Sequence, residues 1–303
     1  MYNLTGNFNK ILVIVKEKLI NHIDQHGNIH RRGPKPKFSD VEVIALNLTA
    51  ECLMIDSENY LFKLLNNQEH FFTNLIDRSN YNRRKKNLFR YIEMIRKYLA
   101  QSLCENEDTF VIDSMPVPIC KFQRAKRIKV CRENYESIPD YGFCAAQNMT
   151  YFGYKLHGIT SVNGVITDFD LSKASISDIH FLNDVKEKYA DCLILGDKAY
   201  LSDPMQTELF VDHGLLLKTP MRINQKDYIK QPAVFRKVRK RIETFFSQLV
   251  DQFKINRNYA KSFSGLATRI LSKITGYTLL QFLNKFELKN DITDICKVKH
   301  VLI

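Results

Sequence analysis

The sequence predicts an all-helical N-terminal domain, residues 1–105, and then a mixed-sheet domain of the α+β or α/β class, residues 106–290. In the first part, apolar residues recur every three or four positions, which is the period of a helix. From residue 108 onward, short runs of β-forming residues alternate with helical patterns. A chain of 303 residues, 45% of them hydrophobic, is long enough for about two domains with real cores. Residues 291–303 form a tail without a clear pattern.

The N-terminal domain is predicted to contain several short helices. We expect a helix over residues 1–28 and then a basic hinge rich in Pro and Gly, HRRGPKPK, at residues 30–37. Ser39 and Glu42 have the spacing of a capping box, and Ser57 is a plausible start for a shorter helix. This helix pair fits a DNA-binding helix-turn-helix, although such pairs also occur in ordinary helical bundles.

A basic cluster follows in the same domain. The segment NRRKK is predicted to start a helix whose apolar face continues through Leu88, Ile92 and Leu99. Such a cluster suits DNA backbone phosphates, and the alternative is a solvated helix end. Its proposed DNA-binding residues are Arg83, Arg84, Lys85 and Lys86.

The second domain begins with a carboxylate inside an apolar strand. Phe110, Val111 and Ile112 predict a buried strand, and Asp113 follows them directly. An ionised Asp in a sheet interior is costly unless it is paired or binds a metal. We therefore expect later parts of the chain to meet Asp113.

The rest of the domain supplies two candidates. The predicted elements are a hairpin with its turn at Asn163-Gly164, a helix, two short strands and two long helices. Their ranges are 151–160, 164–171, 176–189, 192–195, 215–218, 233–253 and 265–286. The strand at 192–195 ends at Asp197, and the helix at 233–253 carries Glu243. Arg236 and Arg239 share one face of that helix with Glu243.

This order of elements is the layout of a ribonuclease H-like sheet. In that layout the first and fourth predicted strands lie side by side and parallel, so Asp113 and Asp197 converge, and a late helix adds Glu243. Three carboxylates from rigid elements suit Mg²⁺ or Mn²⁺. Two such ions can activate a water or 3′-hydroxyl and stabilise the leaving oxygen of a phosphodiester. Taken singly, Asp197 could instead cap a turn and Glu243 could pair with Arg239.

The charge balance predicts a polyanionic partner. The net charge is +12 and the pI is about 9.3, which favours nucleic acid, although a merely soluble basic protein is the alternative. Residues 121–132 contain six Lys or Arg and no Asp or Glu, so we expect a loop that lies along DNA. Its proposed contacts are Lys121, Arg124, Lys126, Arg127, Lys129 and Arg132.

The cysteines and the hydropathy predict a cytoplasmic protein. There are seven cysteines and no CxxC pair, which favours free thiols in a reducing compartment. No apolar stretch of about 18 residues is present, so no membrane span is expected.

These motifs resemble those of a DDE transposase, with the insertion sequence 982 family as the nearest match. The resemblance rests on VIDSMPV around Asp113, YKLHG at residues 154–158, LGDKAY around Asp197 and VRKRIETFFSQL around Glu243. It implies a ribonuclease H-like catalytic core, divalent metal dependence, and cleavage and strand transfer at terminal inverted repeats into target DNA. It also implies a homodimer on double-stranded DNA, associated with the bacterial nucleoid.

The chain departs from the related groups on the last helix. There, Tyr, Arg, Glu and Lys stand at fixed spacing, whereas here Arg236 and Val250 replace the Tyr and the Lys. Arg239 still suits a phosphate contact. His157, in YKLHG, and Lys198, after Asp197, are candidates for supporting the site, with a buried structural His and a solvated Lys as alternatives.

Two other functions remain open from the sequence. One is a nuclease on the same fold that hydrolyses DNA without joining it. The other is a DNA-binding protein that has lost catalysis, although all three carboxylates are present.

Overall fold

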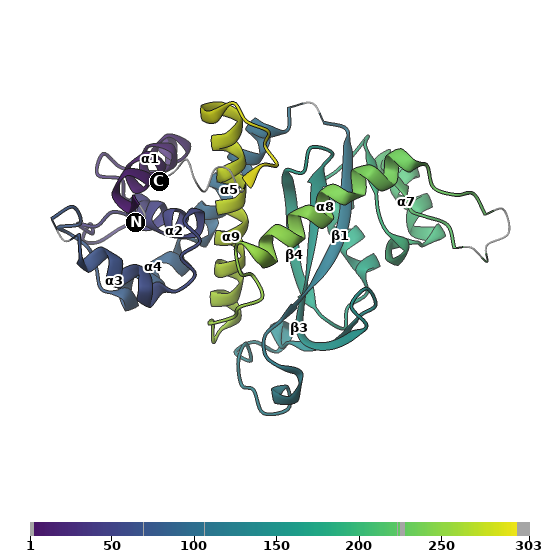
Figure 1. Ribbon diagram of the computed structural model, residues 1–303, viewed down its shortest axis with the longest axis horizontal. Helices are drawn as coiled ribbons and strands as arrows, with labels where there is room; N and C mark the ends of the chain where they lie inside the picture. Colours follow the sequence, from purple (N-terminus) through teal and green to yellow (C-terminus); the bar gives the residue numbers. More distant parts are fainter. Residues whose placement is uncertain (1–2, 69, 106, 223, 225–227, 296–303) are drawn as a thin grey trace. The chain divides into compact units, whose positions relative to one another are not determined.

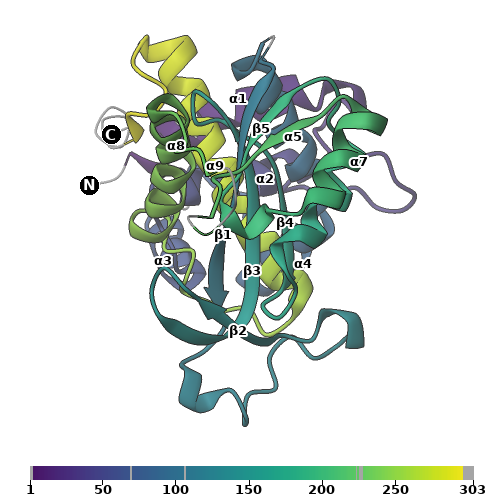
Figure 2. The ribbon, with the colours of Figure 1, turned by 90° about the vertical axis from the view of Figure 1, so that its right-hand side faces the viewer.

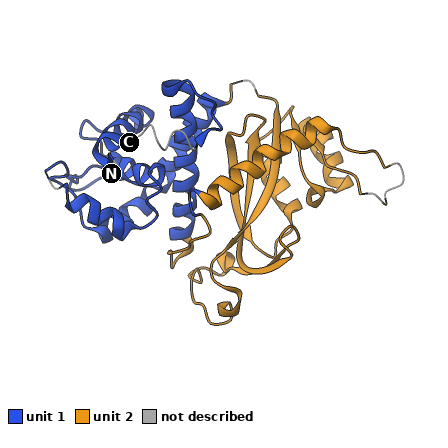
Figure 3. Cartoon of the chain, in the orientation of Figure 1, with its two compact units in different colours: residues 1–103, 252–254, 264–303 blue, residues 104–251, 255–263 orange. Residues whose placement is uncertain are grey.

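A computed structural model describes residues 3–68, 70–105, 107–222, 224 and 228–295. The chain divides into two compact units (Figure 3). Unit 1 comprises residues 1–103, 252–254 and 264–303, and unit 2 comprises residues 104–251 and 255–263. The sequence assigned residues 264–290 to the second domain, whereas their contacts group them with the first.

Unit 1 is helical, as predicted. Its helices are α1 (Leu4–Lys18), α2 (Asp40–Cys52), α3 (Glu58–Asn66), α4 (Arg78–Asn87), α5 (Phe89–Leu103) and α9 (Phe263–Leu283). The first residue of α9, Phe263, belongs to unit 2. The capping box is confirmed at the start of α2, and the Ser57 side chain caps α3.

Two of the predicted helix limits in unit 1 are wrong. The helix expected over 1–28 ends at Lys18 and is followed by a 3-10 turn at Ile20–His22. The chain then turns at Gly27, where φ is +79°, and Asp24 accepts hydrogen bonds within that turn. The segment NRRKK does not start a helix. It lies in the second half of α4, which begins at Arg78 after the capping residue Asp77.

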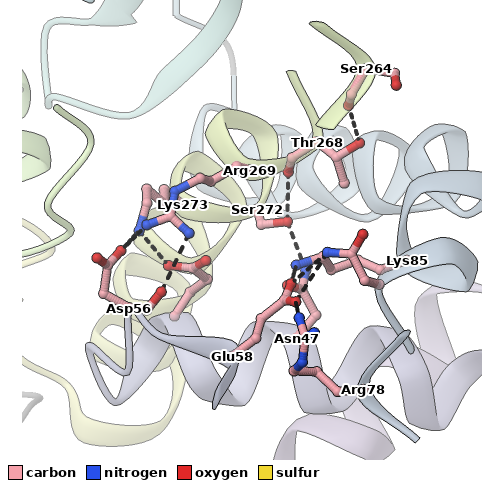
Figure 4. A network of polar contacts seen from close by, with 12 residues as sticks. Asn47, Asp56, Glu58, Arg78, Lys85, Ser264, Thr268, Arg269, Ser272 and Lys273 are labelled. Atoms are coloured by element: carbon pink, nitrogen blue, oxygen red, sulfur yellow. Dashed lines mark hydrogen bonds and ion pairs between the residues drawn. The ribbon is translucent and has the colours of Figure 1, made fainter. Parts of the chain in front are cut away.

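Polar side chains explain why α9 belongs to unit 1 (Figure 4). Lys273 is 1% exposed and lies between Glu51 and Asp56, with Nζ 3.1 and 3.0 Å from their carboxylate oxygens. Asn47 of α2 donates to the Ser272 hydroxyl at 2.8 Å. These buried groups are satisfied only when α9 packs against α2, which makes the pairing specific.

Unit 2 contains a mixed sheet (Figure 1). Its strands are β1 (Thr109–Pro118), β2 (Asp140–Cys144), β3 (Met149–Ser161), β4 (Ile166–Lys173), β5 (Leu193–Leu195) and β6 (Leu216–Lys218). The path runs β2-β3-β1-β5-β6, and β4 also pairs with β3. The predicted hairpin is confirmed as β3 and β4, and the predicted parallel neighbours are confirmed as β1 and β5.

Helices cover both faces of this sheet. Figure 2 shows α8 (Ala233–Asp251) and α7 (Asp203–His213) on opposite sides of the strands. Ile112 of β1 packs in a core with residues of α6 (Phe181–Lys186) and α7. Because side chains alternate along a strand, Val111 and Asp113 face the other way. The result is a mixed sheet with helices on both faces, as in ribonuclease H-like domains.

The sequence missed some elements of unit 2. It predicted neither β2 nor α7, whose apolar residues follow no clear period. The helix expected over 176–189 is a 3-10 turn at Asp178–His180 followed by the short helix α6, and Ser177 makes no capping hydrogen bond.

Candidate active site

Asp113 lies in the middle of β1, on the face toward α8. Its direct partner across the sheet is Gly158 of β3. A side chain added at Gly158 would meet Phe246 of α8 at 3.4 Å, so the helix packs closely at this point of the sheet. Opposite residues of paired strands share a face. The side chain of Asp113 therefore points toward the layer that carries Glu243.

Asp197 lies just past the end of the neighbouring strand. Val111 of β1 pairs with Leu195 of β5, and Asp197 follows two residues later. Its Oδ1 accepts the backbone N–H of Ala199 at 2.8 Å, which holds the carboxylate at the start of a 3-10 turn. Parallel pairing of β1 and β5 thus brings two acidic residues, 84 positions apart in the sequence, to adjacent strands.

Helix α8 carries the third carboxylate. Ile242, Phe245 and Leu249 are buried and fix the rotation of the helix. Glu243 is exposed, and Arg239 lies one turn before it. The Nε atom of Arg239 is buried and has no hydrogen-bond acceptor among the residues that the structure describes.

The charges of these four side chains act on one another. Burial, together with the carboxylates of Asp197 and Glu243, raises the pKa of Asp113 to about 7, although the Ser114 N–H and the Arg239 guanidinium act to lower it. Burial also raises the pKa of Asp197, and Arg239 again lowers it. The carboxylates therefore lie near enough to repel one another, which is the situation that a bound cation relieves.

The donor set matches a hard divalent ion. Carboxylate oxygens are the ligands that Mg²⁺ and Mn²⁺ prefer. Within the described ranges, no three His, Cys, Asp or Glu side chains are arranged as a ready metal centre. Asp113 Oδ1 accepts the Ser114 N–H at 2.8 Å and Asp197 Oδ1 accepts the Ala199 N–H, so one oxygen of each already has a backbone partner.

A second polar cluster lies on the other face of β1. Asp178 Oδ1 accepts a hydrogen bond from Ser114 Oγ at 2.9 Å and forms an ion pair with Lys155 Nζ at 3.0 Å. Lys155 also donates to the Ile176 carbonyl at 2.8 Å. Nothing in the sequence indicated that Asp178 would pair with Lys155.

His157 is part of that second cluster. It is 1% exposed, stacks on Phe181 with ring centroids 4.8 Å apart, and places Nε2 2.8 Å from Ser172 Oγ. Burial lowers the pKa of His157 to about 4, although the charge of Asp178 opposes the change. His157 is therefore neutral near pH 7 and lies on the face away from Asp113.

The predicted basic cluster of unit 1 is divided by its contacts. Arg84 donates to Asp40 Oδ1 at 2.7 Å, and Lys85 donates to Glu58 Oε1 at 2.5 Å. Both cations therefore form ion pairs with carboxylates of unit 1. Arg83 is exposed and Lys86 is half-buried.

The basic loop of unit 2 is different. All six of its cations are exposed, and within the described part of the chain none pairs with a carboxylate. The exposed side chains are those of Lys121, Arg124, Lys126, Arg127, Lys129 and Arg132. Arg236 and Lys198 are also exposed. Of the helices described, none combines the length and apolarity needed to span a lipid bilayer.

Sequence reasoning missed two features of the site. One is the Asp178–Lys155 ion pair, for which two isolated residues 23 positions apart gave no signal. The other is the group of aromatic residues near the basic loop. Phe122 in KFQR and Tyr141 in DYGF are visible in the sequence, but nothing indicated that β2 would bring them together.

Comparison with known proteins gives one family. The family described as Transposase DDE domain matches residues 105–279, which is more than half of the chain. The match covers Asp113, Asp197 and Glu243. No curated protein matches this chain.

Proposed function

This chain belongs to the family with a transposase DDE domain, and we propose that it moves an insertion sequence by cutting DNA at terminal inverted repeats and joining the ends to target DNA. A DDE transposase domain is a catalytic domain for DNA cleavage and strand transfer, so the chain is an enzyme that acts on DNA. The element that we propose it moves is of the insertion sequence 982 type and is bounded by inverted repeats.

We assign catalysis to Asp113, Asp197 and Glu243. The observation that supports this best is the parallel pairing of β1 with β5, together with α8 on the face of β1 that Asp113 occupies. Transposases of this kind generally use divalent metal ions, and here the three carboxylates would hold two Mg²⁺ or Mn²⁺. Bound ions would activate the attacking water or 3′-hydroxyl and stabilise the leaving oxygen.

The cations have separate roles in this proposal. The buried Nε of Arg239 has no acceptor among the described residues, and its charge acts on the carboxylates of Asp113 and Asp197, which suits a scissile phosphate that binds between them. The six cations of the basic loop, with Arg83, Lys86, Arg236 and Lys198, would contact backbone phosphates and hold the DNA in register. Two protomers on the DNA would bring two ends together, so we propose a homodimer in the complex.

A strand-transfer assay tests this function. Purified protein is given a pre-cut end that carries the inverted repeat flanking its own gene, plus a supercoiled target, with Mg²⁺ or Mn²⁺. Joined products are expected with wild-type protein, and Asp113→Asn, Asp197→Asn and Glu243→Gln should each abolish them while DNA binding in EDTA persists. Asp203→Asn, an exposed carboxylate at the start of α7, is the matched control and should join normally.

Two results would contradict the proposal. Hydrolysis of the end without any joined product would favour a nuclease on the same fold. Joining by Asp197→Asn at the wild-type rate would remove that residue from the catalytic set.

A further inference from the structure

The β2 end of the sheet combines exposed aromatic rings with free cations. Tyr141 and Phe143 alternate with inward residues along β2, so both rings point outward on one face, and they are 41% and 62% exposed. Phe122, 50% exposed, contacts Tyr141 edge to face, with ring centroids 5.9 Å apart. We call Phe122, Tyr141 and Phe143 the aromatic platform.

The platform is anchored to the core. The Tyr141 ring contacts Phe152 of β3, which is 4% exposed, at a centroid distance of 4.9 Å. Burial of a large aromatic side chain lowers the free energy of the folded chain, so three exposed rings forgo stability that burial would provide. A set of exposed rings held in place by a buried one is therefore a surface built for contact.

The basic loop next to the platform is also held in place (Figure 1). Cys131 is fully buried, and its N–H donates to the Lys261 carbonyl at 2.9 Å. Ala125 is buried within the loop, and shortly after the loop the hydroxyl of Tyr154 donates to the Ser137 carbonyl at 2.6 Å. The loop thus presents its six cations from an anchored backbone.

A pocket of about 430 Å³ lies where the loop meets the platform. Phe122, Met149 and Tyr151 give it apolar and aromatic walls. Lys121, Asn256 and Asn258 also line it, and the Asn258 side chain accepts the Ala260 N–H at 2.8 Å. A flat ring with hydrogen-bonding edges would find stacking surface, amide groups and a cation together here.

We propose that the aromatic platform, the pocket and the basic loop form a binding surface for single-stranded DNA. Bases in a duplex are already stacked on each other and offer their faces to no side chain, whereas unpaired bases stack on exposed aromatic rings. The cations of the loop would track the phosphates of the same strand. This inference deepens the proposed function, because cutting and joining DNA ends exposes unpaired nucleotides.

The test uses the full-length protein in EDTA, so that no DNA is cut. Fluorescence anisotropy measures binding of a labelled single strand and of the duplex with the same sequence. The triple variant Phe122→Leu/Tyr141→Leu/Phe143→Leu keeps apolar bulk and removes the rings. It should weaken single-strand binding by about tenfold or more, on the scale of lost base stacking, and change duplex binding less than about twofold.

Three further variants separate the contribution of the aromatic rings from that of the charges. Phe210→Leu removes an exposed ring on α7, 58% exposed, and should leave both affinities unchanged. Arg124→Gln/Arg127→Gln should weaken binding of both DNA forms and reduce the salt dependence, because fewer counterions are released. Lys16→Gln, an exposed lysine of α1, is the control for charge. Circular dichroism and thermal melting check that each variant is folded.

The inference is overturned if the triple Leu variant, folded, binds the single strand as tightly as wild type, or if it loses duplex and single-strand binding equally. An RNA strand of the same sequence that binds more tightly would replace DNA as the partner. The strand-transfer assay is scored separately. Joining by wild type with normal single-strand binding by the variant refutes only this inference, and ring-dependent binding without any joining refutes only the proposed function.

Discussion

Asp178 and Lys155 form an ion pair, with 3.0 Å between Oδ1 and Nζ, on the face of β1 opposite Asp113. Ser114 connects the two faces. Its hydroxyl donates to Asp178 at 2.9 Å, and its backbone N–H donates to Asp113 Oδ1 at 2.8 Å. The pair therefore fixes the backbone segment that sets the direction of the proposed metal ligand.

Replacing Asp178 should affect strand transfer more than DNA binding. Asp178→Asn removes the charge that holds Lys155 and weakens the Ser114 contact, so the rate of joining pre-cut ends should fall roughly tenfold, as for residues that orient metal ligands. The Mg²⁺ concentration for half-maximal rate should rise, which a purely structural loss would not produce. Asp203→Asn is the control, and an unchanged Mg²⁺ dependence with normal joining would contradict the positioning role.

Arg239 should matter to the reaction through its charge. Arg239→Gln removes the cation whose charge acts on both Asp113 and Asp197 and leaves the phosphate without a donor, so the single-turnover joining rate should fall by about 100-fold. Arg239→Lys should recover part of it. Arg241→Gln, two residues along the helix and exposed, serves as the matched variant. Equal rates for the two Gln variants would count against the assignment.

The stability of the metal-free protein should depend on Asp113 and on pH. Its pKa in the folded chain is about 7, above the ordinary 3.8, so the unfolded chain loses this proton first as pH rises. The Asp113 contribution is therefore neutral below about pH 4 and destabilises the fold increasingly up to about pH 7. In EDTA at pH 7.5, Asp113→Asn should unfold at a higher urea concentration than the wild type. Its free energy of unfolding should be larger by roughly 1–2 kcal/mol, after discounting for the partial exposure of Asp113.

Two comparisons control that measurement. At pH 4 the advantage of Asp113→Asn should disappear. Added Mg²⁺ should stabilise the wild type and not the variant, because only the wild type keeps the carboxylate. A constant difference between wild type and variant at every pH would show that the carboxyl proton plays no part.

The buried lysine of unit 1 should be costly to remove. Lys273→Met leaves the Glu51 and Asp56 carboxylates without their shared cation, so the free energy of unfolding should fall by about 3–5 kcal/mol. Urea unfolding followed by circular dichroism measures it. Lys16→Met, at an exposed position of α1, should change stability by less than about 0.5 kcal/mol. Similar losses in both variants would argue against a specific role for the network.

Local patterns predicted most of the elements, and pairing decided the rest. The apolar run before Asp113 and the run 192–195 indicated strands, and their parallel pairing followed from the order of elements. Strand β2 escaped notice because its outward positions hold Tyr141 and Phe143, which hide the alternation of apolar and polar residues. The limits of the helices near Gly27 and Arg78 depended on turn and capping contacts that outweigh helical periodicity.

The candidate site was predictable in composition but not in its contacts. Carboxylates on predicted strands and on a long helix were visible as residue types at given places. That Arg84 and Lys85 are used by Asp40 and Glu58 was not visible, because those partners lie 44 and 27 residues away. Cation clusters in a sequence do not reveal which of their charges the fold itself neutralises.

The ion pairs of Lys273 also bear on how the chain is made. Glu51 leaves the ribosome 222 residues before Lys273, with all of β1 to α8 between them. At common synthesis rates of about 5–20 residues per second, that interval lasts roughly 10–45 s. Until it has passed, the nascent helices hold two acids that lack their cation, so unit 1 completes its core only after unit 2 has emerged.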